Sequence, residues 1–371
     1  MNTITYVLLN VFYTVTRLLP FSCRTGLVRI GNPDRDSPVL LTCNYHLTVL
    51  RVKRAIKGLD GYLLVAKSRG INVWCAACGG HFTHHDVISA LKTSGIEKLV
   101  DHRNVILPQL AAPGVESVVI KKKTGWRVVW GPVYARDIPA FLENKLTKKD
   151  DMRKVLFPLA DRFEMATAWA APMSLIAALI FLPLWRGAVA PLIFTIWGLS
   201  LAIFLSFPLY ERLLKRQGAH VGFPVILWGL VLLGLVGYLI YWPGFSWPFL
   251  LRWGAACLII ILVLTLDLTG STPTFKSGLH DERLLAVELD KKLCKGAGFC
   301  SEVCPRDCFA VDKPHKTASI PRAEFCVRCG ACIVQCPFDA LCFKSAAGDK
   351  ISPETVRRYK LNLMGKRNVS L

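Results

Sequence analysis

Charged residues are scarce in this chain. They make up 19% of its 371 residues, whereas hydrophobic residues make up 53%. This balance excludes an intrinsically disordered chain, which combines low hydrophobicity with high net charge. Acidic residues are fewer than basic ones, with 26 Asp and Glu against 46 Lys and Arg and a net charge of +20. No nucleic-acid-binding motif accompanies the basic excess, so we expect it to face anionic lipid headgroups and no nucleic acid.

Cysteine is nearly absent from most of the chain. Nine of the fourteen cysteines lie between Cys294 and Cys342. This clustering excludes a disulfide framework spread through the whole chain. It indicates metal ligation in one short segment, in a reducing, cytoplasmic compartment.

Charge almost disappears between Met165 and Gly270. An apolar stretch of ~20 residues spans the hydrocarbon core of a membrane as a helix. We therefore predict a transmembrane domain over residues 165–268. Its four predicted helices cover residues 165–185, 188–210, 223–241 and 247–266.

The loops of this block predict its orientation. Residues 211–217 include Arg212, Lys215 and Arg216, whereas residues 243–246 carry no charge. The positive-inside rule places the basic loop in the cytoplasm. Because the number of spans is even, we expect a multi-pass protein of the inner (cytoplasmic) membrane with both soluble flanks facing the cytoplasm.

The segment over residues 1–22 is apolar apart from Arg17 and a few polar groups. A membrane helix, an interfacial amphipathic helix and a buried helix of the next domain are all compatible with it, and we favour the interfacial helix. No positive charge precedes the apolar run and no small-residue cleavage site follows it. We therefore expect no cleaved signal peptide.

Residues 23–160 alternate between strand-like and helix-like patterns, which favours a Rossmann-like α/β domain with a mostly parallel sheet. Helical spacing occurs over residues 47–59 and 87–99. Strands are predicted over residues 38–42, 61–66, 104–107, 117–120 and 126–130.

The most specific motif is Cys326-x2-Cys329-x2-Cys332-x3-Cys336-Pro337. In two-cluster ferredoxins, three cysteines of such a run hold one iron–sulfur cluster and the fourth ligates the other. A structural zinc site would instead use two separate CxxC pairs. The segment over residues 280–345 thus resembles an α+β bacterial-type ferredoxin domain, followed by a tail over residues 346–371.

An imperfect copy of the motif comes first, with Ala297 in the place of its second cysteine. Crossed ligation assigns one [4Fe-4S] cluster to Cys304, Cys326, Cys329 and Cys332. It leaves Cys294, Cys300 and Cys336 for the second. This second site is a [3Fe-4S] cluster, a [4Fe-4S] cluster completed by Cys308, or a degenerate site without a cluster.

An unusual run, GINVWCAACGGHF, begins at Gly70. Small residues around Cys75 leave an open surface that suits the approach of a flat, bulky ligand. A lone cysteine is more often simply buried. The residues alone leave both interpretations of Cys75 open.

Three segments carry a family resemblance: NVWCAA from Asn72, HRNVILPQLAAPGV from His102 and GWRVVWGPVYARDIPAFL from Gly125. They resemble the corrinoid protein family of mercury methylation, HgcA, over residues 24–275, and LTGST at 268–272 fits the same family. The similarity extends more distantly to the corrinoid iron-sulfur protein of acetyl-CoA synthesis. The C-terminal segment resembles HgcB, the ferredoxin partner in mercury methylation.

The resemblance implies a corrinoid cofactor whose cobalt is ligated by the Cys75 thiolate, with Asn72 and Trp74 framing it. It also implies methyl transfer to a soft metal or metalloid such as Hg(II), with the fused ferredoxin re-reducing the cobalt. A methyl-donor protein or methyl-folate-dependent methyltransferase and a low-potential electron donor would be partners. The alternatives are a membrane-anchored iron–sulfur electron-transfer protein and a corrinoid methyl carrier for a non-mercury acceptor.

The chain departs from the mercury family in residues that would bear on the methyl acceptor. Cys78-Gly79-Gly80 replaces the usual Gly-Lys-Gly, and no cysteine pair follows Cys342. Cys78 with His81, His84 and His85 is either a replacement soft-metal site or a set of residues that solvates the start of a helix.

Overall fold

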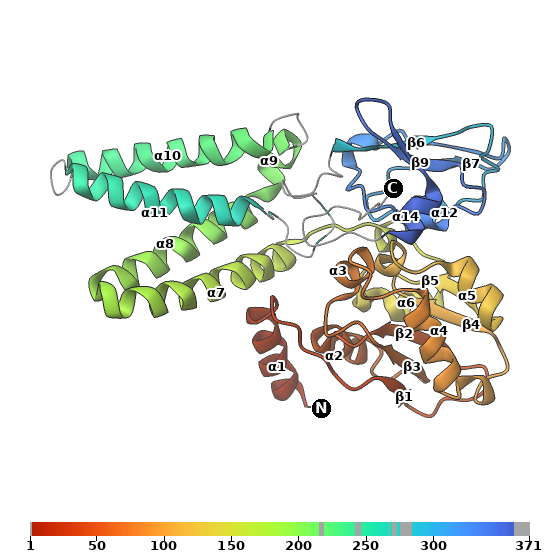
Figure 1. Ribbon diagram of the computed structural model, residues 1–371. Helices are drawn as coiled ribbons and strands as arrows, with labels where there is room; N and C mark the ends of the chain where they lie inside the picture. Colours follow the sequence, from red (N-terminus) through yellow and green to blue (C-terminus); the bar gives the residue numbers. More distant parts are fainter. Residues whose placement is uncertain are drawn as a thin grey trace.

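The computed structural model describes residues 2–214, 219–241, 246–266, 268, 272, 274 and 284–359 (Figure 1). An N-terminal α/β domain and a C-terminal cysteine-rich domain lie side by side. Long helices extend away from both of them, so that both domains lie at the same end of these helices (Figure 1).

The α/β domain is built on a five-stranded sheet of order β1-β3-β2-β4-β5. Strands β2 to β5 run parallel, and only the edge strand β1 is antiparallel to its neighbour β3. All residues of β2 and β3 are buried, which explains their unbroken apolar sequences. The predicted parallel sheet is confirmed, whereas β1 was not predicted. The strands are β1 (Gly26–Ile30), β2 (Val39–Cys43), β3 (Gly61–Ala66), β4 (Asn104–Leu107) and β5 (Arg127–Trp130).

Helices cover both faces of this sheet. One face packs with α3 (Val73–Cys78), α4 (His84–Thr93) and α5 (Ser117–Thr124). The other packs with α2 (His46–Ala55) and α6 (Ile138–Glu143). Single turns of 3-10 helix form the connections η1 (Ile96–Lys98), η2 (Gln109–Ala111), η3 (Ala135–Asp137) and η4 (Asp151–Arg153).

The strand predicted over residues 117–120 is wrong, because these residues open helix α5. Ile120 is buried while Val118 is exposed, and Gly125 ends the helix with a φ of 76°. A run of three β-branched residues is too short for periodicity to distinguish a strand from a helix. The helix predicted over residues 87–99 is interrupted at Gly95, whose φ is 69°.

Within the described residues, four helices are long and apolar enough to cross a membrane. Helix α7 begins six residues before the predicted start, with charged residues in its first turns. Residues 207–210, predicted as the end of the second span, and residues 211–214, predicted as part of a loop, instead form the separate helix α9 (Phe207–Leu214). Residues 215–218 and 242–245, which include most of the loops used to predict orientation, lie outside the described residues, as do residues 269–271. The long helices are α7 (Leu159–Leu184), α8 (Arg186–Leu205), α10 (Ala219–Tyr241) and α11 (Trp247–Leu266).

The cysteine-rich domain combines a three-stranded antiparallel sheet of order β10-β9-β6 with the hairpin β7-β8. Strand β10 and helix α14 fall in the segment predicted as a tail, and both pack on this domain. Residues 280–283 and 360–371 lie outside the described residues. The elements are β6 (Ala286–Leu289), α12 (Phe299–Val303), β7 (Ala310–Asp312), β8 (Thr317–Ser319), η6 (Ala323–Phe325), α13 (Ala331–Gln335), β9 (Leu341–Lys344), β10 (Lys350–Ile351) and α14 (Pro353–Arg358).

Residues near the N-terminus form helix α1 (Thr3–Val15), capped by the side chain of Asn2. Tyr6, Leu9 and Tyr13 pack against the α/β core. The opposite side of the helix exposes large apolar side chains at helical spacing. These exposed residues are Ile4, Val7, Leu8, Val11 and Phe12.

Candidate functional site

Helix α3 carries the cysteine that the sequence singles out. Asn72 caps its N-terminus, and its Oδ1 accepts a hydrogen bond of 3.0 Å from the Cys75 backbone N–H. The inner side of the helix consists of Val73, Ala76 and Ala77, which are buried. Cys75 is exposed on its outer side. The small and apolar residues thus fix the helix to the domain and leave Cys75 accessible.

A close backbone approach holds α3 against the loop that follows η2. A Cβ atom on Gly114 would lie 2.5 Å from the carbonyl oxygens of both Ala77 and Phe82. Since real Cβ contacts are not this short, the position requires glycine. Gly114, which lies in the segment HRNVILPQLAAPGV that carries the family resemblance, therefore positions helix α3.

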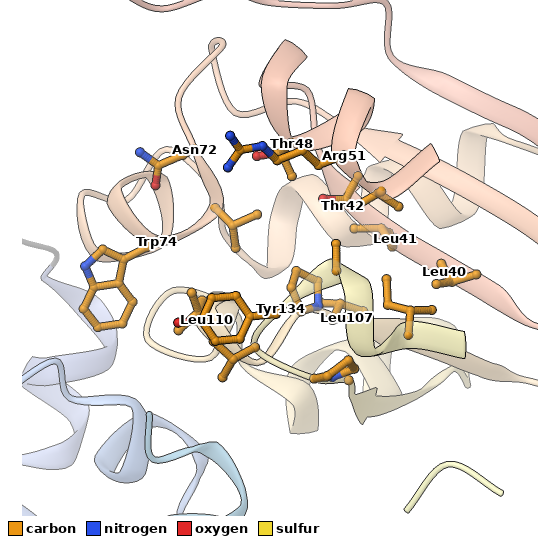
Figure 2. A pocket seen from close by; sticks show the side chains of 18 of the residues that line it. Leu40, Leu41, Thr42, Thr48, Arg51, Asn72, Trp74, Leu107, Leu110 and Tyr134 are labelled. Atoms are coloured by element: carbon orange, nitrogen blue, oxygen red, sulfur yellow. The ribbon is translucent and has the colours of Figure 1, made fainter. Parts of the chain in front are cut away.

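A cavity of about 240 Å³ lies beside α3 at the carboxyl ends of the parallel strands. Strand β2 lies between β3 and β4, and ligands of open α/β sheets bind where the strand order reverses in this way. Figure 2 shows Asn72 and Trp74 of α3 on one side of the cavity and side chains of β2 on the other. Most of the remaining wall is apolar, including Leu40, Leu107 and Leu110.

Among the described residues that line this cavity, two buried polar atoms lack a hydrogen-bond partner: Nε of Arg17 and the hydroxyl of Thr42. Thr42, the second-last residue of strand β2, is 3% exposed, and its hydroxyl has no hydrogen-bond partner in the part of the chain described. Burying an unpartnered hydroxyl costs about 1–3 kcal/mol. The hydroxyl is therefore suited to a polar atom of a bound molecule.

Charged and phenolic groups form the rim of the cavity. Glu164 accepts hydrogen bonds from Arg17 at 3.0 Å and Arg51 at 2.7 Å. The Tyr134 hydroxyl donates to Asp161 at 3.1 Å. Burial, and next the Asp161 carboxylate, raise the pKa of Tyr134 to about 12, so this hydroxyl stays protonated.

Two of the three predicted corrinoid-site residues, Asn72 and Trp74, line the cavity. Cys75 does not line it and lies on the exposed side of the same helical turn. Sequence reasoning missed Thr42, Arg51 and Tyr134. The sequence did contain a signal for Thr42, because it is a polar residue near the carboxyl end of a buried, apolar strand, where ligands of parallel sheets bind.

The cluster cysteines line two separate hollows in the cysteine-rich domain. Cys294, Cys300 and Cys336 surround the first hollow. Burial raises the pKa of Cys300 to about 11. Five cysteines surround the second hollow: Cys304, Cys308, Cys326, Cys329 and Cys332. Within the described residues, no group of three or more His, Cys, Asp or Glu side chains is arranged to hold a single metal ion.

Cys308 lies in the second hollow, away from the three-cysteine set that it would complete in one of the alternatives left open by the sequence. Its backbone N–H donates to the Cys304 sulfur at 3.3 Å. Hydrogen bonds with Cys304 and Cys326 raise the pKa of the Cys308 thiol. Cys342 lines neither hollow.

The second hollow lies against the α/β domain. Val303 and Ala331 are buried in the core cluster of that domain, and Cys329 packs against it. The pKa of Cys329 is raised by burial first and then by the nearby Cys78 of α3. The cysteine domain therefore approaches the helix that carries Cys75.

Cys78, His81, His84 and His85 do not form a metal site among the described residues. His84 pairs with Glu116 at 3.2 Å, and its ring contacts that of His85 with centroids 4.2 Å apart and ring planes at 41° to each other. Both histidines open helix α4, which a Thr83–Asp86 capping box initiates. Of the two interpretations that the sequence leaves open, the structure agrees with the one in which these residues solvate the start of a helix.

Comparison with known proteins locates the similarity in the α/β domain. A family model for the CO dehydrogenase/acetyl-CoA synthase delta subunit matches residues 3–142. The acetyl-CoA decarbonylase/synthase complex subunit gamma of Archaeoglobus fulgidus is 35% identical over 133 residues, which cover 35% of this chain and 28% of that protein. The subunit of the same name from Methanopyrus kandleri is 36% identical over 128 residues, covering 34% and 27%.

The matching protein from Methanothermobacter thermautotrophicus is 37% identical over 126 residues, covering 33% of this chain and 27% of that subunit. The chain thus matches less than a third of the length of these relatives. The four long helices and the cysteine-rich domain lie outside the residues that the family model matches. The α/β domain is therefore similar to subunits of acetyl-CoA decarbonylase/synthase complexes.

Proposed function

We propose that this chain is a membrane-bound corrinoid methyl carrier. The observation that carries the proposal is that α3, with Cys75 exposed on it, bounds an apolar cavity at the carboxyl ends of β2 and β4. The similarity to acetyl-CoA decarbonylase/synthase subunits supports a methyl carrier of the corrinoid iron-sulfur type.

The residues around the cavity fit such a cofactor. When bound, a corrinoid supplies a cobalt ion that accepts and releases a methyl group. Cys75 would provide the thiolate ligand, and Asn72 would hold the helical turn that presents it. Trp74 and Leu110 would offer apolar surface to a flat ring, and the Thr42 hydroxyl would bind a polar substituent.

The cysteine-rich domain would supply electrons to that site. Thiolates are the ligands that iron–sulfur clusters use, and such clusters reach low reduction potentials. The five-cysteine hollow supports one [4Fe-4S] cluster on Cys304, Cys326, Cys329 and Cys332. The first hollow, with three cysteines, supports another cluster on Cys294, Cys300 and Cys336. The thiolates of an iron–sulfur cluster bind several different iron atoms. They are therefore not expected to converge on a single metal ion.

We further propose that the methyl acceptor is not mercury. The similar proteins described above are subunits of acetyl-CoA decarbonylase/synthase complexes, which favours a protein partner for methyl transfer. The missing Lys near Cys75 points the same way. Methylmercury formation by cells that express the chain, lost in a Cys75→Ala variant, would restore the mercury hypothesis.

The membrane is the proposed location, with α7, α8, α10 and α11 as spans. Helix α1 would lie in the interface on the cytoplasmic side. Its exposed apolar side chains support this placement, as do the exposed Leu159 and Phe163 at the start of the neighbouring helix α7.

Anaerobic reconstitution of the detergent-solubilised chain with cobalamin tests the proposal. We expect bound corrinoid with the absorption spectrum of a thiolate-ligated cobalt, which Cys75→Ala removes. Cys342→Ala is the matched control and leaves the spectrum unchanged, because Cys342 lies on β9 outside both hollows. A chain that loads iron but binds no corrinoid would refute the carrier and favour a membrane electron-transfer protein.

A further inference from the structure

The three-cysteine hollow has no fourth ligand in its wall. Besides Cys294, Cys300 and Cys336, the described residues around it are glycine, alanine, proline, leucine and phenylalanine, together with Lys295. None of these side chains is an anionic ligand for iron. A complete cubane cluster normally takes four cysteine thiolates. The donor set therefore does not fit a cluster with four protein ligands.

Cys308 does not supply the missing thiolate. It is buried in the other hollow, where its backbone N–H donates to the Cys304 sulfur at 3.3 Å. Movement into the three-cysteine hollow would require this buried contact to break. The structure therefore assigns Cys308 to the neighbourhood of the other cluster.

Ala297 occupies the position where a fourth ligand would be expected. It lines the hollow, midway in sequence between Cys294 and Cys300, as Cys329 stands between Cys326 and Cys332. The backbone after each position is alike, because Gly298 and Gly330 have φ values of 84° and 79° and each precedes a short helix. The two motifs thus share their local conformation and differ in one side chain.

We propose that this hollow holds a cluster with three protein thiolates and one open corner, which is a [3Fe-4S] cluster when oxidised and takes up Fe(II) when reduced. Uptake combines one oxidised three-iron cluster of charge +1, one Fe²⁺ ion and one electron into a [4Fe-4S] cluster of charge +2. Bonds form between the added iron and the sulfides at the open corner, and no protein ligand is lost. The electron comes from a low-potential donor. This inference rests on the iron–sulfur loading in the proposed function.

Metal analysis with electron paramagnetic resonance of the full-length, anaerobically purified chain tests the open corner. After oxidation by ferricyanide we expect ~7 iron atoms per chain and the signal of a three-iron cluster. Dithionite with added Fe²⁺ should abolish that signal. Ala297→Cys should raise the iron content to ~8 and remove the three-iron signal, whereas Cys308→Ser should leave it unchanged.

An oxidised wild-type chain without a three-iron signal, combined with loss of one cluster in Cys308→Ser, would overturn the proposal by making Cys308 the fourth ligand. If Ala297→Cys fails to fold, the three-iron signal of the wild-type chain and its response to Fe²⁺ still decide whether the cluster has an open corner. Cobalamin binding by the same preparation is measured separately by absorption. The corrinoid proposal can therefore fail or stand independently of the open corner.

Discussion

The side-chain amide of Gln335 donates a hydrogen bond of 2.6 Å to the backbone carbonyl of Val115. Gln335 directly precedes Cys336 in the cysteine-rich domain, and Val115 follows Gly114, whose backbone touches α3. A single loop of the α/β domain therefore contacts both the helix of Cys75 and a helix between two cluster cysteines. This contact ties the two proposed cofactor sites together.

Replacing Gln335 should loosen this contact. The side chain is 2% exposed, donates to Ala112 at 2.8 Å as well as to Val115, and accepts from the Ser117 hydroxyl at 2.8 Å. We expect Gln335→Ala to cost about 2–3 kcal/mol, because it leaves buried groups unpaired. Faster amide hydrogen exchange over residues 112–117 would report the change. Ser117→Ala removes one of these bonds and should have a smaller effect, of about 1 kcal/mol. Equal protection in all three proteins would contradict this role.

A methyl group at Gly114 should displace α3. The added Cβ would meet the carbonyl oxygens of Ala77 and Phe82, which are backbone atoms that cannot rotate away. We expect Gly114→Ala to lower the free energy of unfolding by about 1–3 kcal/mol, as overpacking does. Gly198→Ala is the control, since no atom lies within 4 Å of the Cβ position there. Denaturant titration of both variants measures the difference, and an unchanged midpoint in Gly114→Ala would show that the loop adapts.

The sequence predicted the parts of this fold that depend on local pattern. Strands β2 and β3 are unbroken apolar runs because both of their faces are buried, and the apolar helices follow from composition. The run at Val118–Ile120 was misread, because Ile120 is buried while Val118 is exposed, and three residues are too few to show this helical pattern.

The site depends on contacts that no local pattern contains. The unpartnered hydroxyl of Thr42 becomes visible only when the strand ends are assembled around the cavity. The spacing of Cys308 to Cys304 fits either cluster, and only the folded chain places it with Cys326.

Docking of the two domains should depend on pH through Lys148. Its Nζ donates to the Gln109 side chain at 2.8 Å and to the carbonyl of Glu302 at 3.0 Å, across the domain contact. Burial lowers the pKa of Lys148 from 10.5 to about 8. The unfolded chain therefore binds more protons between these two values, so the contribution of Lys148 to stability rises as pH increases from 8 toward 10.5.

Lys148→Met separates this effect from the titration of cysteines. Since methionine cannot titrate, the variant should lack the part of the stability rise that Lys148 causes, although it also loses both hydrogen bonds at every pH. Denaturation midpoints of both proteins between pH 7.5 and 9.5, measured with iron content held equal, give the comparison. Parallel pH profiles would show that the lysine does not titrate in this range.

Photocrosslinking should place helix α1 at the lipid surface. Leu8 is 65% exposed on the apolar side of α1, and α1 packs beside the domain-side end of α7 (Figure 1). An apolar stripe on a surface helix binds the headgroup–acyl boundary of a bilayer. In nanodiscs, a photoreactive phenylalanine analogue at Leu8 should form lipid adducts that mass spectrometry detects. The same analogue at Val118, which is 59% exposed on α5 of the soluble domain, should form few. Adducts to protein alone at Leu8, or equal lipid labelling at both positions, would show that α1 has another partner.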